Sequence, residues 1–231
     1  MRDDICTIPV SEVFEHNDGC PICRMRDTIE ERMTDYIVGD AMMEPDVRIE
    51  TNKTGFCEHH YNNMMSRRGR LQLALMLQTH INEINGEIFK KKLFNTDSKK
   101  TGNAKNITDS CFICSKIEWG LSRMIETVYR CYETQKDFRD MFNSQSMFCL
   151  PHYERLLGGA SKRNMKSYYS EFSENLNRIT GEYSKSLYDD LSKYCTMYDY
   201  RSRDGETDWG GSRDAVERTV AFLNGRIYDV Y

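Results

Sequence analysis

The feature that most constrains this chain is a pair of matching cysteine and histidine sets, which can act together only if the fold brings them together. Each set is a C-x2-C pair followed, after 33 or 34 intervening residues, by a C-x2-H pair. The copies are displaced by 91 residues at the first pair and 92 at the second. This displacement indicates an internal duplication. The eight residues are Cys20, Cys23, Cys57, His60, Cys111, Cys114, Cys149 and His152.

Three thiolates and one imidazole form a common tetrahedral donor set for zinc. Cysteines that merely pack as small apolar side chains would give no reason for a histidine to recur at the fourth position. The sequence therefore predicts two structural zinc ions per chain in Cys3His sites. Iron–sulfur clusters are usually held by four cysteines but accept histidine, so iron stays open as the less favoured metal.

Two questions about the ligands arise from the spacing. Either His59 or His60 follows Cys57 closely enough to bind, but the position matching His59 in the second copy is Pro151, which cannot bind metal. We therefore assign His60 as the ligand and expect His59 to be an ordinary polar side chain near the site. The ligands can close within each copy or cross between copies, and we expect closure within each copy because shorter loops cost less entropy.

The hydrophobic pattern predicts an all-α fold. Apolar residues recur at helical spacing, strand-like alternation is scarce, and no glycine-rich stretch has a phosphate-binding spacing. We expect two metal-pinned helical hairpins, each followed by a long amphipathic helix, and a C-terminal capping helix. His80 falls within the first long stripe and is expected to be a helix residue without a ligand role. The helical segments are 24–38, 73–88, 117–132 and 169–191, with a returning segment at 136–143.

The predicted organisation follows the repeat. It consists of a first metal-binding repeat at 1–94, a polar linker at 95–109, a second metal-binding repeat at 110–199 and a tail at 200–231. Ser11 is a plausible N-cap for a short leading helix. In the tail, Ser212 is the expected N-cap and Gly225 the expected stop of a helix. Trp209 and this helix are expected to dock on the body of the protein.

Composition excludes several classes of protein. The net charge of −4 disfavours a dedicated nucleic-acid binder, although residues 61–105 hold nine cations against three acids. The longest apolar run, Leu73–Leu77, has five residues against the ~20 needed to span a bilayer. The first residues lack the basic and apolar pattern of a signal peptide. Nine cysteines, an odd number, do not suit a complete disulfide framework. We expect a cytoplasmic protein that neither spans nor binds a membrane.

The predicted role is non-enzymatic: a scaffold or interaction module with an unknown protein partner. Four protein ligands leave no open position for water or substrate on a zinc ion. The alternative is an iron–sulfur protein or a thiol-redox protein that uses Cys20 and Cys23. No other residues form a convincing catalytic arrangement. Cys6, Cys131 and Cys195 lie outside the ligand sets and are expected to be inert thiols.

The motifs "DGCPICR", "GFCEHHYNNMM" and "MFCLPHYERLL" resemble those of an uncharacterised bacterial family known only as a domain of unknown function. The similarity includes a Cys-Pro-x-Cys opening, a Gly-Phe-Cys-x-x-His element, a weaker second copy and a tail helix ending in Leu-x-Gly. The resemblance implies a bacterial cytoplasmic protein and supports the eight ligands, but it implies no activity. The second copy has Phe112 where the first has Pro21, and Met147 where the first has Gly55. If one site binds metal more weakly than the other, we expect it to be the site of the second copy.

Overall fold

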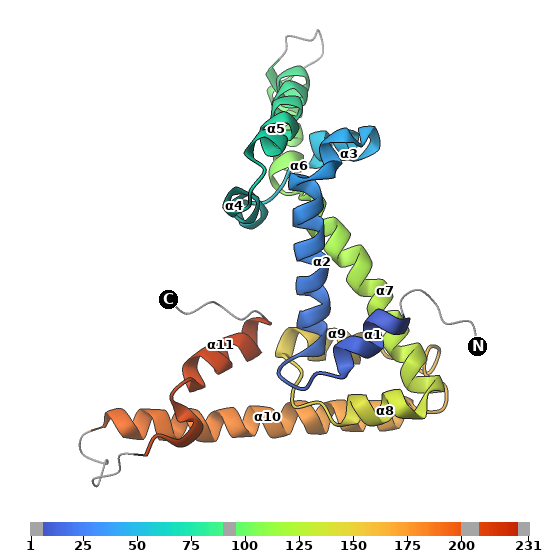
Figure 1. Cartoon of the computed structure of the whole chain (residues 1–231), viewed down its shortest axis with the longest axis vertical. Helices are drawn as coiled ribbons and strands as arrows, with labels where there is room; N and C mark the ends of the chain where they lie inside the picture. Colours follow the sequence, from blue (N-terminus) through green and yellow to red (C-terminus); the bar gives the residue numbers. More distant parts are fainter. Residues whose placement is uncertain (1–6, 90–95, 200–207, 226–231) are drawn as a thin grey trace. The chain divides into compact units, whose positions relative to one another are not determined.

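The structure, a computed structural model, describes residues 7–89, 96–199 and 208–225. The regular elements in these ranges are all helical and none is a strand, which confirms the all-α fold (Figure 1). The α-helices are α1 (Thr7–Phe14), α2 (Pro21–Val38), α3 (Pro45–Thr54), α4 (Glu58–Ser66), α5 (Arg70–Ile84), α6 (Asp97–Thr108), α7 (Phe112–Thr134), α8 (Lys136–Asn143), α9 (Leu150–Gly159), α10 (Tyr169–Tyr198) and α11 (Ala215–Asn224). The 3-10 turns η1 (Asp40–Met43) and η3 (Gly210–Ser212) and the π-helical turn η2 (Asn85–Phe89) connect them.

The chain divides into two compact units, and each unit draws segments from both predicted repeats. Unit 2 is the continuous stretch Arg26–Leu121. Unit 1 is discontinuous and combines Met1–Met25 with Ser122–Tyr231. The boundaries fall inside α2 and α7, so each of these helices begins in one unit and ends in the other.

Unit 2 has a small aliphatic and aromatic core. Leu73 and Met76 of α5 are buried there, together with Met64 of α4 and Ile37 at the end of α2. Phe112 belongs to the same core and makes an edge-to-face contact with Phe56, with ring centroids 6.4 Å apart. Because Phe56 precedes Cys57 and Phe112 follows Cys111, this core directly adjoins the predicted ligands.

Unit 1 is built around a cluster of buried aromatic rings. Phe142 of α8 stacks on Phe148 with centroids 4.9 Å apart, and it packs at the same centroid distance against Phe172 of α10. Phe14 of α1 and Tyr132 of α7 complete the contacts of Phe142. Aromatic pairs in such offset and edge-on arrangements add to the stability that burial provides. Phe148 is followed by Cys149, so this core also reaches a predicted ligand.

Trp209 and helix α11 dock on α10; the sequence predicts docking on the body of the protein without naming the helix. Trp209 contacts Tyr194 and Tyr198 of α10 edge-on. Farther along, Phe222 of α11 packs against Tyr183 of α10. Figure 1 shows helix α11 beside α10. The expected stop is also confirmed, because Gly225 ends α11 in the left-handed conformation.

Three local expectations differ from the structure. Ser11 lies inside α1 instead of capping it, and Asp214, not Ser212, occupies the N-cap of α11. The stretch 95–109, expected to be a non-periodic linker, contains α6. Helix α6 buries no residue, so its sequence has no apolar stripe by which the helix could be predicted. Its N-terminus is capped by the Thr96 hydroxyl, which accepts a hydrogen bond from the Lys99 backbone N–H.

No helix in the described ranges combines the length and apolar character that crossing a bilayer requires.

The aromatic core of unit 1 gives a stability prediction. Phe142→Ala removes a fully buried ring that contacts four other aromatic side chains, and it should lower the free energy of unfolding by about 3–5 kcal/mol. Chemical denaturation followed by circular dichroism measures the loss. Tyr188→Ala, at a residue that is 71% exposed on α10, is the control and should change stability by less than about 0.5 kcal/mol. Equal effects of the two substitutions would contradict this description of the core.

Candidate metal centre

The eight predicted residues meet in two clusters of four, each drawn from both repeats. Centre A consists of Cys20, Cys23, Cys149 and His152. Centre B consists of Cys57, His60, Cys111 and Cys114. In each cluster the four donor atoms lie within 4.8 Å of one another, a spacing that could hold a metal ion. Centre A lies wholly in unit 1 and centre B wholly in unit 2.

The expectation that each copy closes on itself is therefore wrong. The entropy cost of closing a loop rises only as the logarithm of loop length. It therefore differs little between closure within each copy and pairing between the copies. Linking Cys23 to Cys149, 126 residues apart, costs only about 1 kcal/mol more than linking pairs separated by 33 residues. Contacts among the segments that carry the ligands outweigh a difference of this size.

All four ligand pairs sit at helix starts. Cys57 and Cys149 are the N-caps of α4 and α9, and Cys20 and Cys111 immediately precede α2 and α7. At each start the carbonyl of the first cysteine accepts the first helical hydrogen bond, from the backbone N–H four residues later. The second ligand of each pair comes three residues after the first, on the same side of the first turn. Each centre therefore lies at two helix N-termini, whose dipoles stabilise negative charge on sulfur.

Short hydrogen-bonded contacts hold the two halves of centre B together. The backbone N–H of Phe112 donates to the Gly55 carbonyl over 3.0 Å. The Ser110 hydroxyl donates to the Thr54 carbonyl over 2.8 Å. Gly55 has a φ of 58°, and a Cβ built there would lie 2.8 Å from Nε2 of His80. This position therefore requires glycine, and the approach to centre B depends on it.

The two halves of centre A are also held together by hydrogen bonds, which here are made by the side chains of Asn17 and Gln145. The Asn17 side chain donates to the Ser144 carbonyl over 2.9 Å and accepts from the Ser146 backbone N–H over 2.5 Å. The Gln145 amide donates to the Phe14 carbonyl over 2.7 Å. These contacts fix the segment before Cys20 beside the segment before Cys149.

In both centres the histidine turns Nδ1 toward the sulfurs. In centre A, Nδ1 of His152 lies 3.1 Å from Sγ of Cys149, 3.3 Å from Sγ of Cys23 and 3.6 Å from Sγ of Cys20. The sulfurs of Cys23 and Cys149 are 3.6 Å apart.

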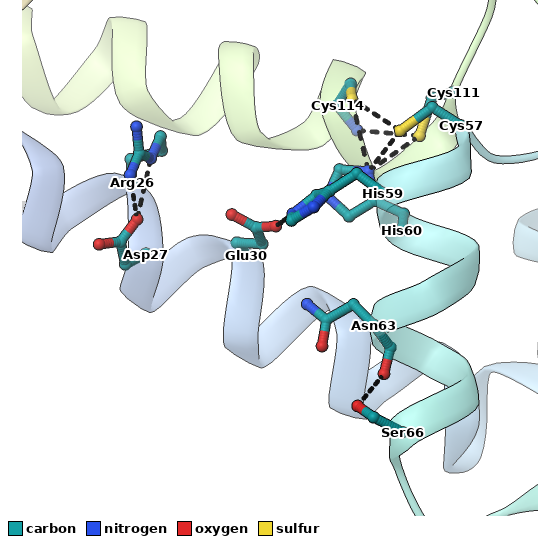
Figure 2. Close-up of polar contacts among 10 residues, drawn as sticks. All are labelled: Arg26, Asp27, Glu30, Cys57, His59, His60, Asn63, Ser66, Cys111 and Cys114. Atoms are coloured by element: carbon teal, nitrogen blue, oxygen red, sulfur yellow. Dashed lines mark hydrogen bonds and ion pairs between the residues drawn. The ribbon is translucent and has the colours of Figure 1, made fainter. Parts of the chain in front are cut away.

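Centre B has nearly the same dimensions. Nδ1 of His60 lies 3.1 Å from Sγ of Cys57, 3.2 Å from Sγ of Cys111 and 3.4 Å from Sγ of Cys114. The sulfurs of Cys57 and Cys114 are 3.8 Å apart. Figure 2 shows the three sulfurs gathered on one side of the His60 ring.

These separations fit a tetrahedral zinc ion. With Zn–S bonds of about 2.3 Å and Zn–N bonds of about 2.0–2.1 Å, the tetrahedron has S···S edges of roughly 3.8 Å and S···N edges of roughly 3.6 Å. The separations given above lie at or slightly inside the required spacing, and every other pair of donor atoms in each cluster is within 4.8 Å. Both the geometry and the chemistry of the donors suit the metal.

The electrostatics of centre B favour one thiolate beside one imidazolium. Burial works against charge on His60, but Cys111 and Glu30 outweigh it and raise its pKa to about 10. Burial also opposes the Cys111 thiolate, yet His60 and backbone N–H groups lower the pKa of Cys111 to about 6. Burial and the neighbouring Cys111 charge raise the pKa of Cys114 to about 12.

Centre A shows the same concentration of charge on one sulfur. Burial opposes ionisation of Cys20, but donors from Cys149, Cys23 and His152 hold the pKa of Cys20 well below its usual value. The Cys20 thiolate in turn raises the pKa of Cys149 to about 12. The pKa of Cys23 is also raised, chiefly by Cys149 and Cys20. Hydrogen bonds among the thiols come first among the causes, with burial and the charge on Cys20 adding to them. A divalent cation at the centre of the cluster would replace the thiol protons and stabilise the thiolates.

An outer pair of donors, Glu30 and His59, adjoins centre B. Oε1 of Glu30 lies 3.2 Å from Nε2 of His60 and 2.5 Å from Nε2 of His59 (Figure 2). The pKa of Glu30 is lowered to about 2, mainly by His60, although burial opposes this. A carboxylate on the far nitrogen of a metal-binding imidazole orients the ring and raises its basicity.

Centre A has a different neighbour, the end of the tail helix. The Cys23 thiol lies 3.2 Å from the Gly225 carbonyl oxygen, to which it donates. Gly225 has a φ of 66°, and a Cβ built there would lie 3.1 Å from Sγ of Cys149. The end of α11 therefore covers centre A at Gly225, and only glycine fits at the point of contact.

Residues 1–230 match the sequence profile of a family described as "Family of unknown function (DUF6062)". The chain belongs to this family. No curated protein and no solved structure matches the DUF6062 chain. The resemblance seen in the motifs is thus confirmed at the level of the family, and the family carries no assigned activity.

Sequence reasoning missed three residues that shape the centres of this DUF6062 protein: Glu30, Gly55 in its steric role, and Gly225 in its contact with the cluster. Glu30 lies on α2 among many surface acids, and no spacing distinguishes it. The histidine and the three cysteines expected to lie outside the ligand sets can also be located. His80 is buried outside the clusters, with Nδ1 2.8 Å from the Asn52 carbonyl oxygen. Cys131 is buried, Cys195 is exposed, and Cys6 lies outside the described residues.

The crossed pairing predicts which double substitutions destroy one site and which destroy two. Cys23→Ser with Cys149→Ser removes two ligands of centre A, so zinc-loaded protein dialysed against zinc-free buffer should keep one zinc. Cys23→Ser with Cys57→Ser damages both centres and should keep none. Elemental analysis after dialysis gives the count. Closure within each copy requires the reverse result, because Cys23 and Cys57 would then share one site.

Proposed function

We propose that this protein binds two zinc ions in closed Cys3His centres and serves as a non-enzymatic scaffold or interaction module. The observation that supports this best is the pair of clusters in which one histidine nitrogen and three sulfurs lie within 4.8 Å of one another. In each centre four protein donors would fill the zinc coordination shell, whereas catalytic zinc sites keep one position for water or substrate. The chemistry therefore favours a structural metal over a catalytic one.

Zinc in these centres would stabilise the fold directly. Structural zinc sites contribute an apparent binding free energy of about 10–16 kcal/mol at neutral pH. Each centre joins segments that are distant in sequence: residues 20–23 with 149–152, and 57–60 with 111–114. Such cross-links suit a chain in which only 39% of the residues are hydrophobic.

Iron is the alternative metal, and thiol-redox chemistry is the alternative activity. The same cysteines would serve an iron–sulfur cluster, with histidine as an accepted ligand. Against a Cys20–Cys23 redox pair, both residues share their cluster with Cys149 and His152, and the pair precedes a helix in an all-α unit instead of following a strand.

We propose a protein, not a nucleic acid, as the partner. Helix α5 is apolar on several sides: Leu73 and Met76 are buried, while Leu71 and Ile81 are 69% and 53% exposed. An exposed apolar face suits protein contacts. In the basic stretch before α5, Arg67 already pairs with Asp35, which reduces the positive charge available to phosphates.

The proposal places the protein in a bacterial cytoplasm. Thiolate ligands require a reducing compartment, because an oxidising one converts neighbouring thiols to disulfides. The eight described cysteines are all free thiols.

Metal content is the first experimental test. Protein purified anaerobically without a metal-affinity tag should contain about two zinc per chain and show no visible colour. Elemental analysis and an absorption spectrum measure both. Iron with broad visible absorption would contradict the zinc assignment and favour the iron–sulfur alternative. A chain without bound metal that stays fully folded would contradict the whole proposal.

Loss of a ligand should unfold the unit that holds it. Cys20→Ser should raise amide hydrogen exchange in unit 1, around α9 and the start of α2, and Cys111→Ser should do so in unit 2, around α4 and the start of α7. Hydrogen exchange read by mass spectrometry locates the change. Cys195→Ser is the matched control, because Cys195 is exposed and outside both clusters. Exchange rates that stay unchanged in both ligand variants would argue against a structural metal.

A further inference from the structure

The two centres differ in how well their sulfurs are enclosed. In centre A, Cys20, Cys149 and His152 are buried and Cys23 is partly exposed. In centre B, His60 and Cys111 are buried, but Cys57 is partly exposed and Cys114 is exposed. Cys114 is therefore the ligand residue of the two centres that is most accessible to solvent and dissolved ligands.

The surroundings of the two centres increase this difference. Centre A is covered by the end of the tail helix, where the Gly225 carbonyl oxygen lies 3.2 Å from Sγ of Cys23. Centre B instead has the outer pair, Glu30 and His59, of which His59 has 48% of its side chain exposed. Among the described residues, Glu30, His59 and His60 form the one further group of three donors besides the two centres.

The outer pair has the chemistry to bind zinc. Carboxylate oxygen and imidazole nitrogen are both ordinary zinc ligands. Oε1 of Glu30 and Nε2 of His59 are 2.5 Å apart. They lie on the Nε2 side of the His60 ring, and the three sulfurs lie on its Nδ1 side (Figure 2). A zinc ion held by the outer pair would be one imidazole ring away from the sulfurs of centre B.

We propose that centre B is an exchangeable zinc site, loaded and unloaded through Glu30 and His59, and that centre A keeps its zinc permanently. The inference rests on the proposed zinc-binding function and divides its two sites into different roles. The ligand is Zn²⁺ carried by small thiolate or chelating molecules.

The transfer needs only ligand substitution. An arriving zinc ion binds Glu30 and His59 and keeps water or its carrier at the other positions. The ion then leaves Glu30 and His59, keeping water or its carrier, and passes around the His60 ring to the exposed Cys114 and the partly exposed Cys57. These thiols displace water or carrier, since zinc can expand to five ligands during a substitution. Cys114 and Cys57 each give a thiol proton to water as they bind, His60 gives the proton on Nδ1, and the Cys111 thiolate binds without losing one. The carrier leaves with its own electron pairs. Release follows the same steps in reverse, and no oxidant or reductant takes part.

Release kinetics test the proposal on the full chain. Zinc-loaded protein is mixed with excess 4-(2-pyridylazo)resorcinol, a chromophoric chelator, and zinc release is followed by stopped-flow absorbance. We expect two phases of one zinc each. The protein carrying His60→Ala and Cys111→Ser should lack the fast phase and keep the slow one. Two zinc ions released in a single phase, or a fast phase that survives this double substitution, would overturn the proposal.

His59→Gln tests the outer pair, because His59 contacts Glu30 and lies outside both clusters. It should slow uptake and release at centre B by the same factor and so leave the equilibrium affinity unchanged. His16→Gln, another exposed histidine, is the matched control and should change neither rate. Faster release with weaker binding would mean that the outer pair only orients His60, and that result also overturns the proposal.

Alkylation gives a second readout that does not depend on the chelator. In zinc-loaded protein treated with N-ethylmaleimide, mass spectrometry should find Cys57, Cys111 and Cys114 modified before Cys20, Cys23 and Cys149. Equal rates in the two groups would contradict the inference while two zinc per chain still supports the proposed function. Fewer than two zinc per chain would instead count against the proposed function itself.

Discussion

The structure depends on one local arrangement that occurs four times: a cysteine able to bind metal lies at the start of a helix. A cysteine occupies the N-cap of α4 and α9 and the position just before α2 and α7, and a second donor follows three residues later. At Cys57 and Cys149 the side chain makes no capping hydrogen bond. The sulfur is directed to the cluster instead, and the exposed N–H groups of the first turn provide positive potential for it.

The clusters and the apolar cores are continuous with each other. In unit 2, Phe56 and Phe112 stand next to ligands in sequence and pack into the core with Leu73 and Met76. In unit 1, Phe148 precedes Cys149 and stacks on Phe142. A disturbance of the donors therefore reaches the packed side chains through a single peptide unit, and each core reinforces the geometry of its centre. This coupling lets a strongly polar chain keep two ordered units.

The sequence carried much of this architecture, for reasons that differ between elements. The helices around 24–38 and 117–132 and the short segment 136–143 were predictable because their buried side chains recur at helical spacing. The eight donors were predictable because two copies of one pattern must be explained together. The choice of His60 over His59 came from comparing the copies, and the structure places His60 with the sulfurs.

Other features had no local signal. Helix α6 buries nothing, so its sequence shows no stripe. The pairing of donors between copies depends on contacts such as Phe112 N–H to Gly55 carbonyl, which join positions far apart in sequence. The carboxylate of Glu30 reaches His60 from a helix whose exposed face carries other acids. Such long-range contacts cannot be predicted from hydrophobic periodicity or from the spacing of the ligands. The entropy of loop closure does not identify them either, because it changes only with the logarithm of loop length.

Unit 2 is inserted within the sequence of unit 1, and this order along the chain has a consequence for biosynthesis. Unit 2 is an uninterrupted stretch, and all four donors of centre B have been translated by residue 114. Centre A must wait for residue 152, and the glycine that covers it comes at 225. As the chain leaves the ribosome and folds from its N-terminal side, Cys20 and Cys23 stand without their partners while the inner unit is completed. During that interval two thiols are open to oxidation or to the wrong metal partner, so the order of translation itself makes a reducing compartment important.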